Sequence, residues 1–93
     1  HKIEVEVSKE SDLREAVRSG ADIILLDNLS PEETARMVEV ARALAPNLLL
    51  ESSGGITLEN VRAYAEAGAN LISIGALTHS ARAMDISFKI QPA

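Results

Sequence analysis

The sequence has no cysteine and no tryptophan, and Tyr64 and Phe88 are its only tyrosine and phenylalanine. Without cysteine there is no disulfide and no thiolate metal site, so a reducing, cytoplasmic setting is expected. Basic residues are also few, because 9 Lys and Arg stand against 14 Asp and Glu and give a net charge of −5. Cationic and aromatic side chains supply most of the affinity for nucleic acids, so this composition disfavours a nucleic-acid partner.

Long apolar runs are absent as well. None approaches the ~20 residues needed to cross a bilayer, and no charged-then-apolar leader opens the sequence, so we expect no membrane association. The 93 residues, 46% hydrophobic and 25% charged, are ordinary for one soluble globular domain. The sequence starts at His1 rather than at methionine and runs directly into a strand-like segment, which indicates a fragment of a longer protein.

Short apolar runs alternate with helical patterns along the chain. Residues 3–7 alternate apolar and charged side chains, as a strand with one buried face does, whereas 23–26 is a continuous apolar run typical of a buried parallel strand. Further strands are predicted at 48–50 and 71–74. Helices are predicted from about Ser11 to Gly20, from Ser30 to Pro46 and from Thr57 to Gly68. Residues 84–90 alternate again and are expected to form a last short strand or a packing arm.

These elements predict an α/β fold with the order β-α-β-α-β-α-β, right-handed crossovers and a parallel sheet. Three such units and a fourth strand are about half of a TIM-like barrel, which takes ~250 residues. A half barrel leaves parallel edges open and one sheet face uncovered, so either the rest of the barrel is missing or the chain associates. A weak internal repeat fits this organisation, since residues 18–24 (RSGADII) echo residues 66–72 (EAGANLI).

Acidic side chains stand where three neighbouring predicted strands end, at Glu6, Asp27 and Glu51. Reactive groups of barrels lie at the carboxyl ends of the strands. Adjacent strands are ~4.8 Å apart, so Glu6 and Asp27 could together reach one hard cation or the hydroxyls of one sugar. One such acid alone is more often solvated or caps the next helix. Three together favour a site, with Glu6 and Asp27 as catalytic and metal-binding candidates and Glu51 in support.

Glycines follow the third and fourth predicted strands, as Gly54-Gly55 and as Gly75. Glycine lets backbone N–H groups approach an anion closely, and a following helix N-terminus adds a favourable dipole. These glycines could simply form tight turns. Two such loops on adjacent strands, with Ser53 beside one and His79 beside the other, nevertheless favour a site for a phosphate monoester. His79 is explained equally well as a surface residue and as a phosphate donor or acid–base group.

Five segments, in this order and spacing, carry a family resemblance: KIEVEV at 2–7, LLDN at 25–28, LESSGGI at 50–56, GALTHS at 75–80 and MDIS at 84–87. Together they make the chain resemble the C-terminal part of quinolinate phosphoribosyltransferase, the decarboxylating nicotinate-nucleotide pyrophosphorylase. The barrel of that family is of the type II phosphoribosyltransferase kind. The resemblance covers essentially the whole chain, and the motifs taken together are highly specific.

The resemblance implies an enzyme that transfers phosphoribosyl from 5-phosphoribosyl 1-pyrophosphate to quinolinate with decarboxylation. The products are nicotinate mononucleotide, pyrophosphate and carbon dioxide, on the de novo route to NAD, and the cofactor is Mg²⁺. By resemblance, Glu6 and Asp27 correspond to the acidic residues that bind magnesium and the ribose hydroxyls of the donor. The loops around its 5-phosphate are matched by Ser53, Gly54, Gly75 and His79.

The chain departs from the family in length. Members have an N-terminal sandwich domain and earlier barrel strands, which supply the basic residues that hold the quinolinate carboxylates. Residues 1–93 are therefore expected to be the C-terminal half of the barrel domain, inactive on quinolinate by itself. Family members form dimers or hexamers, so a homo-oligomer is expected. Two alternatives stay open: a molybdenum-associated paralogue of the same fold, and an excised or engineered half barrel that serves as a folding or assembly module.

Overall fold

Strands and helices alternate along the part of the chain that the computed structural model describes, residues 1–75 and 85–89. The strands are β1 (Glu4–Val7), β2 (Ile23–Asp27), β3 (Leu49–Ser53), β4 (Leu71–Gly75) and β5 (Asp85–Lys89). The helices are α1 (Glu10–Arg18), α2 (Pro31–Leu44) and α3 (Val61–Glu66). The predicted β-α-β-α-β-α-β order is confirmed, and the alternating segment near the end of the sequence contributes a strand.

The strands form one sheet in the order β1-β2-β3-β4-β5. The first four run parallel, as predicted, and β5 pairs antiparallel with β4, from Leu71↔Lys89 to Gly75↔Asp85. Each parallel strand lies beside its neighbour in sequence because one crossover helix joins each pair. The carboxyl ends of β1 to β4 consequently lie at the same edge of the sheet.

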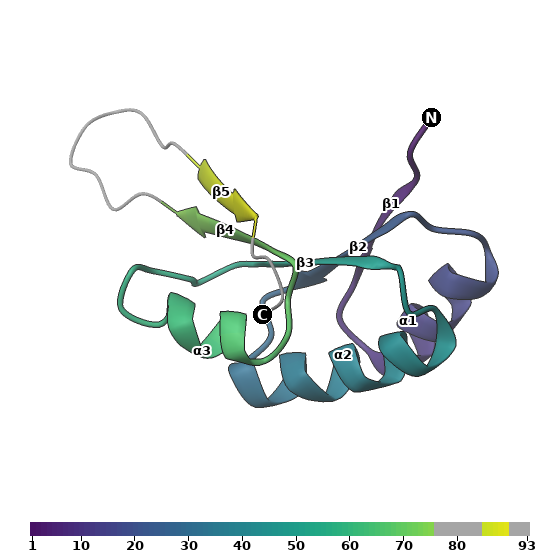
Figure 1. Cartoon of the computed structure of the whole chain (residues 1–93), viewed down its shortest axis with the longest axis horizontal. Coiled ribbons are helices and arrows are strands. Elements are labelled where there is room, and N and C mark those ends of the chain that lie inside the picture. Colours follow the sequence, from purple (N-terminus) through teal and green to yellow (C-terminus); the bar gives the residue numbers. More distant parts are fainter. Residues whose placement is uncertain (76–84, 90–93) are drawn as a thin grey trace.

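All three helices lie on the same face of this sheet (Figure 1). The strand residues alternate accordingly, and Ile24, Leu26, Leu50 and Ile72, which pack toward the helices, are at most 1% exposed. They belong to two hydrophobic clusters, a larger one beneath α1 and α2 and a smaller one that includes Tyr64 of α3. Burial of these side chains on one face is the main favourable term holding helices to sheet.

The opposite face of the sheet carries the alternate residues of each strand. Glu6, Leu25, Asp27 and Glu51 lie there and are exposed or half-buried. Within residues 1–75, no helix covers this face (Figure 1). This is the uncovered face that the sequence predicts for a half barrel, and in a closed barrel it would point to the interior.

The end of α1 and the start of α2 lie where the sequence signals predict. Gly20 follows α1 with a φ of 89°, the left-handed conformation that glycine adopts without strain. Ser30 caps α2: its hydroxyl accepts a hydrogen bond from the Glu33 N–H, and the Glu33 carboxylate accepts one from the Ser30 N–H. Among the described helices, none is long and apolar enough to cross a bilayer.

The third helix begins later than predicted. Thr57, expected to open it, instead starts a turn in which its hydroxyl accepts from the Glu59 N–H at 3.2 Å. Its own N–H donates to Asn60 Oδ1 at 2.8 Å, and α3 starts at Val61. Short polar side chains offer the backbone local partners that compete with helical hydrogen bonds. The prediction missed this competition.

Candidate functional site

The predicted acidic residues share the uncovered face of the sheet near the carboxyl ends of β1, β2 and β3. The strand register places Glu6, Leu25 and Glu51 in one row across the sheet. Asp27 pairs with Ser53 in the next row toward the carboxyl ends. Glu6 and Asp27 therefore lie on adjacent strands, offset by one row, on the same face.

Hydroxyl groups on neighbouring strands hold two of the three carboxylates. Ser53 Oγ on β3 donates to Asp27 Oδ1 on β2 at 3.4 Å, a long hydrogen bond. Ser73 Oγ on β4 donates to Glu51 Oε2 on β3. Each bond links side chains across a strand pair, so the orientation of Asp27 and of Glu51 depends on the register of the sheet.

The carboxylates alone do not form a closed metal site. Among the side chains of residues 1–75, no three acidic or histidine side chains gather closely enough to hold a metal ion. Two carboxylates on adjacent strands are nonetheless a suitable donor set for Mg²⁺, which commonly uses one or two protein carboxylates and completes its octahedron with phosphate oxygens and water. Glu6 and Asp27 fit that requirement better than they fit a cation that needs six or more protein oxygens.

Gly54 and Gly55 follow β3 in a sharply turned loop. Both are left-handed, with φ values of 88° and 70°. A Cβ atom at Gly54 would lie 3.0 Å from both Cα and N of Asn28, a contact tighter than most real side chains make, and the positive φ adds strain, so this position favours glycine. The group that approaches Gly54 is the Asn28 backbone, and the close approach of an anion to this loop stays a prediction.

The predicted contribution of a helix dipole to phosphate binding at the Gly54-Gly55 loop is not supported by the structure. Residues 56–60 separate Gly55 from Val61, where α3 begins, and α3 has only 6 residues. The glycine pair thus does not sit at a helix N-terminus, and any anion affinity of the loop rests on its backbone N–H groups and on Ser53. Gly75 ends β4 and is exposed, and among the described residues other than its chain neighbours no atom lies within 4 Å of a Cβ built there. His79 lies outside the described residues.

Tyr64 makes a polar contact that the sequence did not indicate. The side chain is 6% exposed, and its hydroxyl donates to the Leu29 carbonyl at 2.7 Å. Burial, with a smaller contribution from the charges of Glu32 and Glu33, raises the pKa of Tyr64 above its ordinary value. Tyr64 therefore stays a hydrogen-bond donor and ties α3 to the loop that follows β2. The only hint of this contact in the sequence was that Tyr64 is the single tyrosine of the chain.

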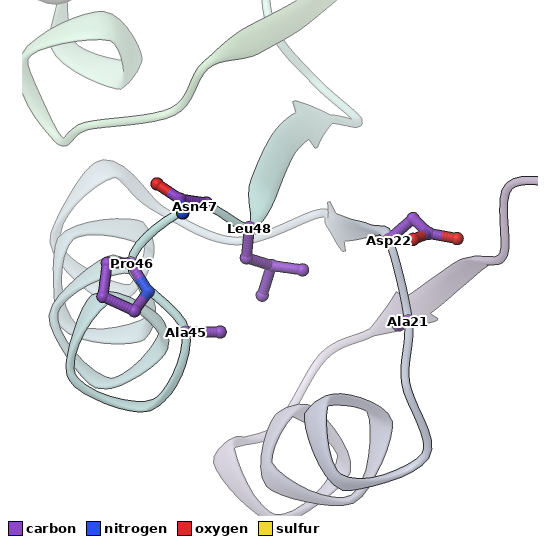
Figure 2. Close-up of a pocket in the computed structure, with 6 residues that line it drawn as sticks. All are labelled: Ala21, Asp22, Ala45, Pro46, Asn47 and Leu48. Carbon is purple, nitrogen blue, oxygen red and sulfur yellow. The ribbon is translucent and has the colours of Figure 1, made fainter.

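A separate pocket of about 310 Å³ lies at the other end of the sheet (Figure 2). It is lined by Ala21, Asp22, Ala45, Pro46, Asn47 and Leu48. These residues precede β2 and β3, so the pocket is at the amino ends of the strands. It lies away from the acidic rows, by which we mean the row of Glu6 and Glu51 and the row of Asp27. The Asp22 side chain points away from the Pro46-Asn47 turn (Figure 2). This pocket contains none of the predicted site residues.

Comparison with known proteins shows consistent similarity. The family model "Quinolinate phosphoribosyl transferase, C-terminal domain" matches residues 1–89. A probable nicotinate-nucleotide pyrophosphorylase (carboxylating) of Bacillus subtilis is 44% identical over 88 residues, covering 95% of this chain and 29% of that protein. The nicotinate-nucleotide pyrophosphorylase (carboxylating) of Homo sapiens is 42% identical over 89 residues, covering 96% of this chain and 30% of that protein.

The fold comparison agrees. The solved structure of the nicotinate-nucleotide pyrophosphorylase from Francisella tularensis superposes with a TM-score of 0.70 at 36% sequence identity. The match covers 95% of this chain and 30% of that one. The chain thus spans about a third of the length of the proteins it matches.

Proposed function

The chain belongs to the quinolinate phosphoribosyltransferase family, and we propose that it is the C-terminal half of the barrel domain of an enzyme that transfers phosphoribosyl to quinolinate. The observation that carries this proposal is the family match over residues 1–89, joined to 44% identity with the Bacillus subtilis protein. Because the chain covers 29% of that protein, the remaining barrel strands and the residues that hold the quinolinate carboxylates would come from outside it.

On this proposal, the acidic rows hold the donor, 5-phosphoribosyl 1-pyrophosphate. Glu6 and Asp27 would bind Mg²⁺ together with donor oxygens, and the bound ion would neutralise charge on the departing pyrophosphate. Carboxylate oxygens of the same two residues would accept hydrogen bonds from the ribose hydroxyls. Their negative charge would also stabilise the positive charge that develops on the ribose ring as the bond to pyrophosphate breaks.

Glu51 supports this arrangement from the row behind Asp27. Its carboxylate accepts from the Ser73 hydroxyl, which fixes its position on the uncovered face. A third negative charge near Glu6 and Asp27 would strengthen cation binding without a direct contact. We assign it a supporting role because Leu25 separates it from Glu6 in the same row, and because its carboxylate already accepts the Ser73 hydrogen bond.

The 5-phosphate of the donor is proposed to bind at the loops after β3 and β4. Ser53 would turn its hydroxyl from Asp27 to the phosphate, Gly54 and Gly55 would offer their backbone N–H groups, and Gly75 would bring its backbone to the phosphate at the end of β4. His79 completes the set by resemblance to the family. Backbone N–H groups suit a phosphate because they donate hydrogen bonds without adding charge that would repel Mg²⁺.

A chimera tests this function. The segment of the Bacillus subtilis protein that matches this chain is replaced by the corresponding residues of the chain, and formation of nicotinate mononucleotide from quinolinate and donor is measured with and without Mg²⁺. A folded chimera that turns over only with Mg²⁺ supports the proposal. A chimera with native circular dichroism but no turnover contradicts it and favours a paralogue or an inactive assembly module.

Substitutions in the chimera then separate the site from the scaffold. Asp27→Asn and Glu6→Gln remove a metal ligand each and are expected to raise the Mg²⁺ concentration needed for half-maximal rate by about tenfold or more. Glu39→Gln, an exposed glutamate on α2, is the matched control and should leave it unchanged. Equal effects of Asp27→Asn and Glu39→Gln would remove Asp27 from the site. The 93-residue chain alone is expected to release no carbon dioxide from quinolinate.

A further inference from the structure

Asn28 follows Asp27 directly and has an unusual backbone conformation. Its φ is 57°, and among the described residues it is the only residue other than glycine with a positive φ. Asparagine tolerates this left-handed conformation better than most residues because its short amide can bond locally, whereas alanine and branched residues are strained there. A non-glycine residue held in this conformation beside a site suggests that the conformation is used.

The left-handed turn directs the Asn28 backbone to the end of the neighbouring strand. The Asn28 N–H donates to the Ser53 carbonyl at 2.8 Å. This bond extends the pairing of β2 with β3 by one step beyond Asp27↔Ser53. The hydrogen bond between Asp27 Oδ1 and Ser53 Oγ lies directly before this backbone bond. The Asn28 N–H therefore helps to keep the two side chains together.

Asn28 also backs the glycine loop. The position of a Cβ on Gly54 is 3.0 Å from Asn28 Cα and N and 3.3 Å from its Cβ, and that of Gly55 is 4.0 Å from Asn28 Oδ1. Asn60, later in the same connection, donates from Nδ2 to the Gly55 carbonyl at 3.1 Å. The loop is thus contacted by Asn28 from the segment after β2 and by Asn60 from its own segment.

We propose that Asn28 is a positioning residue for donor binding: its left-handed backbone joins the metal-side carboxylate of Asp27 to the Gly54-Gly55 loop and sets the spacing between them. This inference rests on the function proposed above, in which Asp27 binds magnesium and the glycine loop binds the 5-phosphate. Asn28 contacts neither group of the donor in this account. It acts through the backbone, so the left-handed conformation matters and the amide side chain does not.

The chimera described above is the background for the test, with separate KM values for donor and for quinolinate. Asn28→Ala is expected to raise the donor KM roughly tenfold, the shift expected when a residue resists the left-handed region. Its quinolinate KM should stay unchanged, because those contacts lie elsewhere. Asn28→Gly keeps the conformation and should leave the donor KM within about threefold of the parent value. Asn47→Ala, at the opposite end of the strands, is the matched control.

Each outcome decides the inference. An unchanged donor KM in Asn28→Ala overturns it, and so does an equal rise in both KM values, which would report general loss of structure. If Asn28→Gly is as impaired as Asn28→Ala, the side chain rather than the backbone conformation is responsible and the inference is also wrong. An inactive parent chimera defeats the proposed function and this inference with it, whereas an active chimera that is insensitive to Asn28 defeats this inference alone.

A double-variant comparison tests whether Asn28 and Gly54 act through one contact. Gly54→Ala drives a Cβ against the Asn28 backbone and should raise the donor KM as Asn28→Ala does. Because both changes disturb the same contact, the double variant should be less impaired than the product of the two single effects. Multiplicative effects would show that Asn28 and Gly54 act independently, which contradicts the proposed coupling.

Discussion

Asp22 and Asn70 each make the same pair of hydrogen bonds to one backbone residue, which is Ile3 for Asp22 and Leu50 for Asn70. Asp22 Oδ2 accepts from the Ile3 N–H at 2.8 Å, and its own N–H donates to the Ile3 carbonyl at 2.8 Å. Asn70 Oδ1 accepts from the Leu50 N–H at 3.0 Å, and its own N–H donates to the Leu50 carbonyl at 2.8 Å. Both residues stand at the same place in the internal repeat, so the repeat is a repeated way of starting a strand pair.

Asn70 should contribute more to stability than Asp22. Its Oδ1 is partly buried and also accepts from the Arg42 guanidinium, so Asn70→Ala leaves both a charge and the Leu50 N–H without that partner. We expect a loss of about 2–3 kcal/mol for Asn70→Ala and about 1 kcal/mol for the exposed Asp22→Ala, measured as free energy of unfolding in urea. Asn70→Asp and Asp22→Asn keep the acceptor and serve as controls. A larger cost at Asp22 would contradict the contrast.

Gly68→Ala and Gly20→Ala should differ although both glycines end helices with positive φ. At Gly68 a Cβ would lie 2.8 Å from Val38 Cγ1, whereas at Gly20 nothing lies within 4 Å. Gly20→Ala should cost about 1 kcal/mol from the backbone alone, and Gly68→Ala about 1–3 kcal/mol more from the collision. Adding Val38→Ala should recover part of the Gly68→Ala loss. If thermal melts show equal losses for the two alanine variants, the collision is relieved without cost.

Tyr64 should make stability fall at alkaline pH. Because burial raises its pKa in the folded chain, the tyrosine releases its proton more readily when unfolded, and stability is full below the ordinary tyrosine pKa of 10.0. Stability then declines as pH rises from that value toward the folded-state pKa. Tyr64→Phe should remove this decline and cost about 1–2 kcal/mol at neutral pH, because the Leu29 carbonyl loses its donor. Urea titrations between neutral pH and strongly alkaline pH would measure both effects.

Glu33 should make stability fall at acidic pH. The Ser30 N–H bond to its carboxylate, with the Ser30 hydroxyl and Arg36 in support, lowers the pKa of Glu33 from 4.5. A lowered pKa in the folded state adds stability that is present above pH 4.5 and disappears as pH falls through the folded-state value. Glu33→Gln should flatten that part of the pH profile, and Glu39→Gln, a change of an exposed glutamate on the same helix, should not. Identical acid profiles for wild type and Glu33→Gln would refute this contribution.

Much of the fold could be predicted because local signals agreed with tertiary packing. The continuous apolar run of β2 and the Ser30 capping box each have one good structural interpretation, and the structure adopts it. Thr57 is the informative failure, since its hydroxyl and the Asn60 amide satisfy a turn that periodicity cannot show. The direction of β5 was likewise undetermined, because alternation of side chains is the same in parallel and antiparallel strands.

The positions of the candidate site residues could be predicted from the sequence, but their contacts could not. Strand-end position marked Glu6 and Asp27, and the structure places both near the carboxyl ends of adjacent strands, as expected. Nothing in the spacing showed that the register would offset them by one row, or that Asn28 would turn left-handed against Gly54. These features depend on how the loops after β2 and β3 meet at the edge of the sheet. The two loops are far apart in the sequence, so local sequence patterns do not show how they pack.

The one-sided packing of the sheet also has a calorimetric consequence. Unfolding exposes apolar surface from the helix-covered face, whereas the face that bears Glu6, Leu25 and Glu51 is exposed or half-buried already. The heat-capacity increase on unfolding comes mainly from newly hydrated apolar area, and polar area reduces it. Scanning calorimetry of the chain should therefore give a smaller heat-capacity increment per residue than for domains whose sheets are covered on both faces. Its stability should consequently change less steeply with temperature.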